Sequence, residues 1–163
     1  MGSCEAHRQT HTFANRPKFH SQLRAISGKP IKSINCHCRM NSIMLFYLIA
    51  CHALMDYALQ GDAMAVCKCR RANHPLQKSV PWFYWLSAHA MLHGMAVGVV
   101  IRWFGYDMVT ATTFAIIETV IHWFVDLGKC EQFFNIHVDQ GIHIACKIAW
   151  WAMLVNGNFA ING

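Results

Sequence analysis

The strongest constraint on the fold is a run of residues, 83–101, that contains no Lys, Arg, Asp or Glu. A helix in a water-soluble bundle needs a polar face toward solvent, and this run offers no charge for one. The run is also about as long as a helix that crosses a bilayer, which takes about 20 apolar residues. The sequence therefore favours a membrane protein over a soluble four-helix bundle.

Three further apolar segments have a similar length. The four segments cover about residues 42–60, 81–103, 107–127 and 138–156. Pro81 suits the first turn of the second segment, and Gly128 suits the end of the third. Several Trp residues lie near segment ends, as anchors at a membrane interface often do. We predict an all-α, polytopic membrane protein with four transmembrane helices in an up-down bundle.

Charge is distributed unevenly along the 163-residue chain, whose formal net charge is +6. Residues 1–39 hold seven Lys or Arg and one acid, whereas residues 40–163 hold seven of each sign. We expect residues 1–39 to form a basic, disordered tail and residues 40–163 to form the four-helix domain. Alternatively, Met40 or Met44 is the natural start. Because the excess charge belongs to the tail, no nucleic-acid partner is expected.

The sequence gives two opposite indications of the orientation in the membrane. Basic residues in the loop 61–80 favour a cytoplasmic location for this loop. The basic tail favours a cytoplasmic N-terminus, which lies on the opposite side in a four-helix topology. If the tail is not natural, the loop decides and both termini face outward.

The eight cysteines show no regular disulfide spacing, and we expect all of them to be reduced. The motifs C-H-C at 36–38 and C-K-C at 67–69, with His74 nearby, are alternative zinc ligands. Because C-x-C is a weaker zinc signal than C-x-x-C, free thiols are the preferred interpretation.

Polar residues recur at four-residue steps inside the apolar segments. They are His52, Asp56 and Gln60 in the first segment, His89 and His93 in the second, Glu118, His122 and Asp126 in the third, and Asp139, His143 and Lys147 in the fourth. This spacing places each set on one face of its helix. In an antiparallel hairpin, the third and fourth sets match in depth, with about 6 Å per step. All four sets fall toward the end formed by loops 61–80 and 128–137.

Imidazoles and carboxylates are ligands for zinc, manganese and iron, and i,i+4 pairs on a helix can share one ion. The candidate metal ligands are His52, Asp56, His89, His93, His122, Asp126, Asp139 and His143. This set fits either two ions or one ion with outer carboxylates that orient the imidazoles. We predict a divalent metal, with zinc preferred over manganese and iron. Glu118 and Lys147 are expected to form an ion pair, whose functional alternative is a proton path.

The same motifs resemble those of a known family. They are H-x3-D-x3-Q in the first segment, H-x3-H-G in the second (His89, His93, Gly94), H-x3-D-x2-K in the third (His122, Asp126, Lys129) and D-Q-x2-H in the fourth (Asp139, Gln140, His143). Over about residues 45–155 the chain resembles small integral membrane proteins of bacteria and phages, known as domain of unknown function 3307. The resemblance implies a polytopic membrane protein without an assigned activity, and makes Gln60 and Gln140 members of the motif.

Two functions follow from these patterns. The first is a membrane-embedded, metal-dependent hydrolase of a lipid or lipid-linked substrate, with Asp56 or Asp126 as general base. The second is a non-catalytic bacterial or phage membrane factor that binds a host membrane protein, with the polar residues locking the helices together. Both place the protein in a lipid bilayer, the bacterial inner membrane or a host cell membrane. A proton or ion carrier is a third option, disfavoured by four helices without an internal repeat.

Overall fold

A computed structural model describes the backbone of residues 31–157 and 159, and side chains from residue 42 onward. The chain divides into two units, Met1–Cys36 and His37–Gly163. The disordered tail was expected over residues 1–39. Residues 1–30 lie outside the described residues, whereas the backbone of residues 31–39 is helical. The following account concerns the second unit.

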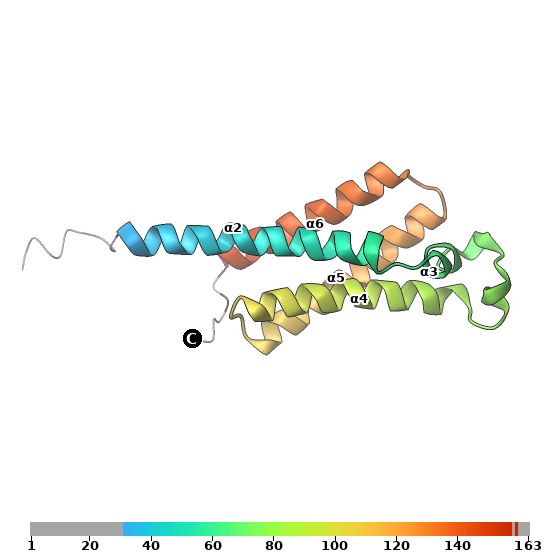
Figure 1. The fold of residues 1–163 in the computed structure, drawn as a ribbon, viewed down its shortest axis with the longest axis horizontal. Helices are drawn as coiled ribbons and strands as arrows, with labels where there is room; N and C mark the ends of the chain where they lie inside the picture. Colours follow the sequence, from blue (N-terminus) through green and yellow to red (C-terminus); the bar gives the residue numbers. More distant parts are fainter. Residues whose placement is uncertain (1–30, 158, 160–163) are drawn as a thin grey trace, which may run out of the picture. The chain divides into compact units, whose positions relative to one another are not determined.

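The described residues form helices and turns, and no strand occurs among them (Figure 1). The elements are α2 (Ile31–Ala53), the π-helical turn η1 (Leu54–Ala58), α3 (Asp62–Cys67), the 3-10 turns η2 (Arg70–Ala72) and η3 (Pro75–Lys78), α4 (Trp82–Trp103), α5 (Met108–Cys130) and α6 (Ile136–Asn156). The all-α prediction is confirmed. Helix α2 begins at Ile31, well before the expected start at 42.

Polar side chains define where two of the long helices begin. Asp107 caps α5, because its carboxylate accepts hydrogen bonds from the side chain and backbone of Thr110. These bonds hold the pKa of Asp107 below its ordinary value. Asn135 caps α6 by accepting from the backbone N–H groups of His137 and Val138. Asp107 thus has a structural role at the start of α5.

Helices α4 and α5 pack closely because α4 lacks side chains where the two meet. A Cβ atom at Gly94 would lie 2.5 Å from the carbonyl oxygen of Ala115 and would collide with the Thr119 hydroxyl. At Gly98, one turn later, a Cβ atom would lie 3.1 Å from the Cβ of Ala115. Small residues at four-residue spacing let helix backbones approach in this way, above all in membranes.

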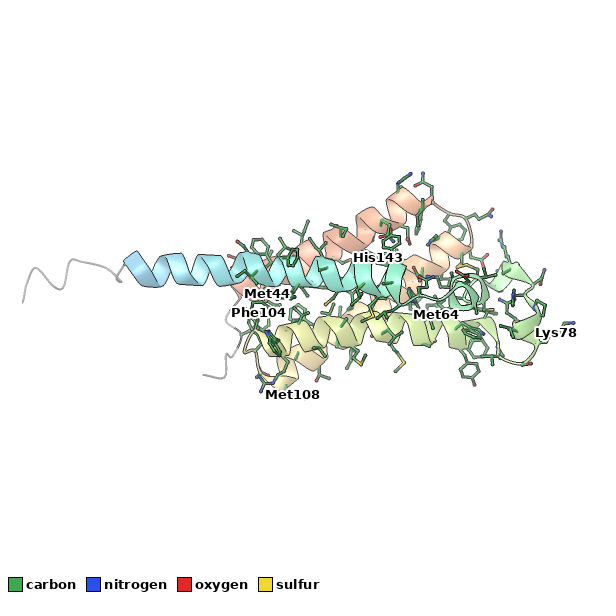
Figure 2. All side chains as sticks on the ribbon, in the orientation of Figure 1. Met44, Met64, Lys78, Phe104, Met108 and His143 are labelled. Carbon is green, nitrogen blue, oxygen red and sulfur yellow. A yellow bond between two sulfur atoms is a disulfide. The ribbon has the colours of Figure 1, made fainter. Side chains whose placement is uncertain are left out.

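The bundle has an apolar end and a polar end. Met44, Ile101, Phe114 and Leu154 belong to a buried cluster at the end where α4 turns into α5. Figure 2 shows Met44, Phe104 and Met108 toward this end, Met64 and Lys78 toward the other, and His143 between them. The histidines and acids therefore occupy the half nearer α3, as the depth argument predicted.

Only two described helices, α4 and α5, are long and apolar enough to cross a membrane. The sequence had predicted four such helices. The apolar part of α2 is shorter, Ser42–Ala58. In α6, Asp139, His143 and Lys147 interrupt the apolar run and lower its mean hydropathy. By length and composition, the prediction of four spans is corrected to two.

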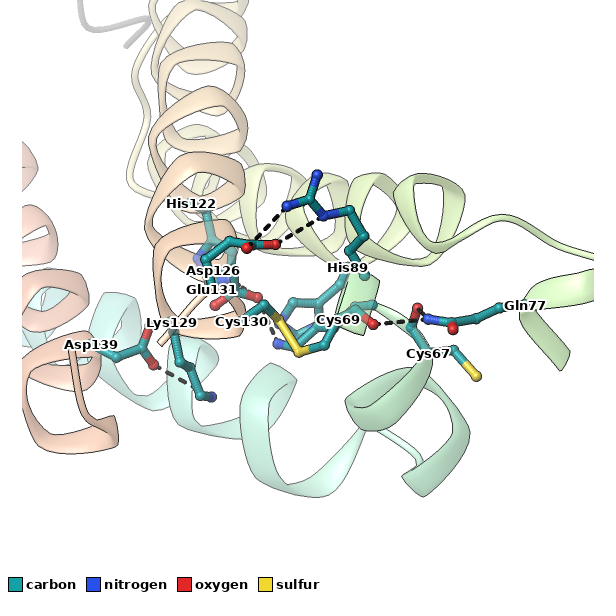
Figure 3. The surroundings of a disulfide bond; sticks show 12 residues. Cys67, Cys69, Gln77, His89, His122, Asp126, Lys129, Cys130, Glu131 and Asp139 are labelled. Carbon is teal, nitrogen blue, oxygen red and sulfur yellow. Dashed lines mark hydrogen bonds and ion pairs between the residues drawn. A yellow bond between two sulfur atoms is a disulfide. The ribbon is translucent and has the colours of Figure 1, made fainter. Parts of the chain in front are cut away.

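Not all cysteines are reduced, because Cys69 and Cys130 form a disulfide (Figure 3). The bond joins the segment between α3 and η2 to the end of α5. It removes Cys69 from the suggested zinc set, while Cys67 keeps a free thiol whose sulfur lies 3.4 Å from Nδ1 of His74. The C-H-C motif lies outside the described side chains. The expectation that all eight cysteines are reduced is thus wrong for this pair.

The close approach at Gly94 can be tested by adding one methyl group. We expect Gly94→Ala to lower the free energy of unfolding by roughly 1–3 kcal/mol, because the α5 backbone must shift. Gly141→Ala is the matched control, since Gly141 is helical, exposed and has nothing within 4 Å of its added Cβ. Thermal unfolding in detergent, followed by circular dichroism, measures both. An equal change in the unfolding temperature of the two variants would contradict the close packing of α4 and α5 at Gly94.

Candidate metal centre

The eight predicted metal-site residues meet inside the bundle. All five histidines of the set are at most 2% exposed, Asp126 and Asp139 are equally buried, and Asp56 is partly buried. Their rings lie together, with centroids 3.8 Å apart for His93 and His122 and 4.1 Å apart for His122 and His143. Ligand-type atoms from α4, α5, α6 and η1 thus share one buried space.

Asp56 reaches this space from the π-helical turn η1. In this turn the N–H of Leu59 bonds to the carbonyl of Leu54, five residues earlier, instead of four. Such π-turns are rare and often occur at functional sites. Oδ1 of Asp56 lies 3.2 Å from Nε2 of His89 and 3.1 Å from Nε2 of His93. With His122, these residues form a four-residue group whose ligand atoms all lie within 4.8 Å of one another.

A chain of hydrogen bonds determines which nitrogen of His93 carries the proton. Nε2 of Gln140 donates to Oδ2 of Asp56, at 2.7 Å. The amide oxygen of Gln140 then faces Nε2 of His52 at 3.3 Å and can only accept, so this nitrogen carries a proton. Nδ1 of His52 is therefore an acceptor, and Nδ1 of His93, 3.3 Å away, donates to it. Nε2 of neutral His93 is left as a lone pair.

This assignment leaves two lone pairs facing each other. Nε2 of His93 and Oδ1 of Asp56 are 3.1 Å apart, yet neither atom has a hydrogen-bond partner. Both nitrogens of His89 and of His122 are also buried without a hydrogen-bond partner. Buried polar atoms are almost always satisfied. The arrangement suits a cation that accepts one lone pair from each of Asp56, His89, His93 and His122, since each residue offers one ligand atom.

A second ligand-type group consists of Asp126, Asp139 and His143. Nε2 of His143 lies 3.6 Å from a carboxylate oxygen of each acid. Here, however, ammonium groups are present: Nζ of Lys68 donates to Oδ2 of Asp126 at 2.6 Å, and Nζ of Lys129 lies 3.6 Å from Oδ2 of Asp139. Oδ1 of Asp139 and Nε2 of His143 lack a hydrogen-bond partner, as atoms of the Asp56 group do. The second group differs from the Asp56 group in having lysines beside its acids.

A third layer separates the polar cluster from the apolar end. Lys147 and the indole N–H of Trp150 both donate to the carboxylate of Glu118, and all three residues are buried. The predicted Glu118–Lys147 ion pair is confirmed. Glu118 also lies 3.7 Å from Nδ1 of His122 and forms a ligand-type group with His122 and His143. Its oxygens are occupied by the two donors.

Sequence reasoning placed some residues differently from the structure. His52 belongs to none of the three groups found in the described part of the chain, and contacts His93 instead. Lys68 is one of the basic residues of the loop 61–80 that were used to argue orientation, but it is 2% exposed and lies against Asp126. Gln140 connects His52, Asp56 and Asp139. Only its place in the D-Q-x2-H motif pointed to this role.

Residues 44–162 match the family described as "Protein of unknown function (DUF3307)". The chain belongs to this family. The match covers all the long helices except the start of α2, and includes every residue of the polar cluster. No curated protein and no solved structure matches the chain significantly. For this DUF3307 protein, function has to be inferred from the site itself.

The Glu118–Lys147 pair yields a prediction about stability. Lys147→Met should cost about 3–5 kcal/mol, because it leaves a buried carboxylate without its ammonium partner. The double variant Glu118→Gln/Lys147→Met should recover most of this loss, since both charges are then absent. Thermal unfolding of the wild type, both single variants and the double variant completes the cycle. Additive losses in the double variant would show that the two charges do not depend on each other.

Proposed function

We propose that this DUF3307 protein is a membrane protein with a divalent metal centre formed by Asp56, His89, His93 and His122. The observation that carries the proposal is the 3.1 Å approach of Oδ1 of Asp56 to the unprotonated Nε2 of His93. Two facing lone pairs repel each other unless a cation lies between them. The hydrogen bonds from Gln140 and through His52 act as the outer contacts that orient metal ligands.

The spacing of these atoms fits a small ion. Zinc–ligand bonds of about 2.0–2.1 Å in tetrahedral geometry put neighbouring ligand atoms roughly 3.3 Å apart. Asp56 lies 3.2 Å and 3.1 Å from the nearest nitrogens of His89 and His93. Three imidazoles and one carboxylate favour zinc, and manganese or iron can use the same ligand types.

We further propose that the centre serves hydrolysis of a lipid or lipid-linked phosphate or ester. A bound divalent ion supplies Lewis acidity and lowers the pKa of water. With Asp56 assigned to the ion, Asp126 is the carboxylate left to act as general base. Its carboxylate lies next to the proposed ligands, with Oδ2 3.5 Å from Nε2 of His89 and 3.7 Å from Nε2 of His122. Because Lys68 donates to Oδ2, the other oxygen, Oδ1, is the one assigned to take the proton.

The outer surface supports a location in a bilayer. Large apolar side chains point outward along the bundle, such as Met91 and Val99 on α4 and Ile116 and Phe124 on α5, while the interior holds the histidines and acids. This arrangement is the reverse of a water-soluble bundle. We propose that the α4–α5 hairpin spans the membrane, and that α2 and α6 lie beside it in the same layer.

The disulfide supports one orientation. Disulfides persist in oxidising compartments, so we propose that the end with Cys69 and Cys130 faces away from the cytoplasm. Arg70 and Arg71 at this end pair with Glu131, and Lys68 is buried, which leaves few free positive charges there. The seven Lys or Arg residues of the segment 1–39 favour a cytoplasmic N-terminus, which agrees with this orientation.

Metal analysis of the protein purified in detergent tests the centre. We expect bound zinc in the wild type and its loss in His93→Ala and His122→Ala, while the exposed-site control His137→Ala keeps it. Circular dichroism shows whether each variant remains helical. A metal-free wild type, with both variants folding normally, would contradict the proposed metal centre. It would support the alternative in which the histidines only hold the helices together.

Catalysis is tested separately from metal binding. We expect zinc-dependent turnover of p-nitrophenyl phosphate or p-nitrophenyl butyrate in mixed micelles, and a loss of roughly 100-fold or more in Asp126→Asn, which lacks the base. The variant should retain its metal. Full metal occupancy without turnover of either probe would count against the hydrolase and for the non-catalytic membrane factor.

Orientation is tested with single introduced cysteines before and after α4. We expect a membrane-impermeant maleimide to label Ser79→Cys in intact cells, but to label Trp103→Cys only after permeabilisation. The parent protein, which keeps its native cysteines, gives the background. The opposite labelling pattern would place the disulfide end in the cytoplasm.

A further inference from the structure

The acids around the metal centre differ in one respect, which is whether a lysine accompanies them. Ammonium groups lie within 4 Å of three: Lys147 at Glu118, Lys68 at Asp126 and Lys129 at Asp139. Asp56 instead contacts the imidazoles of His52, His89 and His93 and the amide of Gln140. Among the acids of this cluster in the described structure, only Asp56 has no lysine within 4 Å.

Lys68 is held in place by contacts on both sides of it in the sequence. The side-chain amide of Gln77 donates to the carbonyl groups of Cys67 and Cys69, at 2.8 and 2.9 Å. Cys69 is joined covalently to Cys130, which lies one helical turn beyond Asp126 on α5. Figure 3 shows this disulfide with Asp126, Glu131 and Gln77 around it.

The two residues after Cys69 add further anchors. Arg70 donates two hydrogen bonds to the carboxylate of Glu131, and Arg71 lies 2.8 Å from the same group. The backbone around Lys68 is thus fixed to the end of α5 by a covalent bond and two ion pairs. The consequence is that a flexible, strongly hydrated ammonium group is kept in a buried position, which a lysine side chain would otherwise leave.

We propose that the bundle binds a single divalent ion, at Asp56, His89, His93 and His122, and that the ammonium of Lys68 takes the place of a second ion at Asp126, Asp139 and His143. This inference rests on the proposed metal centre and defines its stoichiometry. It assigns Lys68 a positioning role: its Nζ, 2.6 Å from Oδ2 of Asp126, occupies the carboxylate that a second ion would need.

The charge balance of the buried space favours one ion over two. With the imidazoles counted as neutral, the four carboxylates carry four negative charges, and the three lysines that contact them carry three positive charges. The negative charge without a lysine partner is that of Asp56. One divalent ion at Asp56 compensates this charge and leaves a single positive charge in excess. A second divalent ion beside Lys68 and Lys129 would place several positive charges together in a low-dielectric space, where their repulsion is strong.

Zinc stoichiometry tests the inference. The detergent-purified, disulfide-bonded wild type is dialysed against zinc chloride, and zinc per chain is measured by mass spectrometry. We expect one zinc in the wild type and two in Lys68→Met, because Asp126 becomes available together with Asp139 and His143. Lys68→Arg, which keeps the positive charge, and Lys78→Met, which removes an exposed lysine from the same loop, should each retain one zinc.

A second variant covers the case that Lys68→Met does not fold. Lys68→Met/Asp126→Asn removes both members of the pair and should bind one zinc, since the second group has lost a ligand. Two zinc ions in the wild type would overturn the single-ion inference and leave the metal centre intact. One zinc in a folded Lys68→Met would also overturn it. A wild type without zinc would overturn the metal centre itself, and this inference with it.

Discussion

The balance of buried charge is the constraint on which the rest of this structure depends. An isolated carboxylate or ammonium inside a protein is very costly, so each has to meet a partner there. Glu118 meets Lys147 and Trp150, whereas Asp126 meets Lys68. These pairs connect α5 to α6 and to the segment after α3. The positions of the helices are thereby coupled to the pairing of a few ionised atoms.

The sequence predicted which residues meet inside the bundle better than it predicted the contacts around them. Steps of four residues are a local property, so the faces of α4, α5 and α6 followed directly from the helix repeat. Depth followed from counting residues away from a turn, which correctly matched His122 with His143 and Glu118 with Lys147. The four helix segments were also predicted, since each is a long apolar run, although α2 begins at Ile31 instead of about residue 42.

The parts that were not predicted depend on long-range contacts or on small departures from regular geometry. The Cys69–Cys130 bond joins residues 61 positions apart, and nothing in their local sequence indicates the pairing. Lys68 resembled the other basic residues of the loop 61–80, because the adjacent residues in the sequence do not indicate whether a loop side chain is buried. The π-turn η1 directs Asp56 toward the histidines by inserting one extra residue into the helical repeat. No sequence pattern indicates such a turn. The close packing at Gly94 and Gly98 was not predicted either, although G-x-x-x-G is a pattern that can be read from the sequence.

The number of spanning helices shows why mean hydropathy and buried polarity have to be considered together. Mean hydropathy counts every residue equally, whichever face of the helix it occupies. In α6, Asp139 and Lys147 lower this mean, yet both are at most 1% exposed, while Ile148 and Met153 are 45% and 49% exposed. The residues that make α6 look too polar for a bilayer are therefore turned away from its surroundings. The surroundings of a helix contact only its outer face, and on that face α6 carries apolar side chains such as Ile148 and Met153.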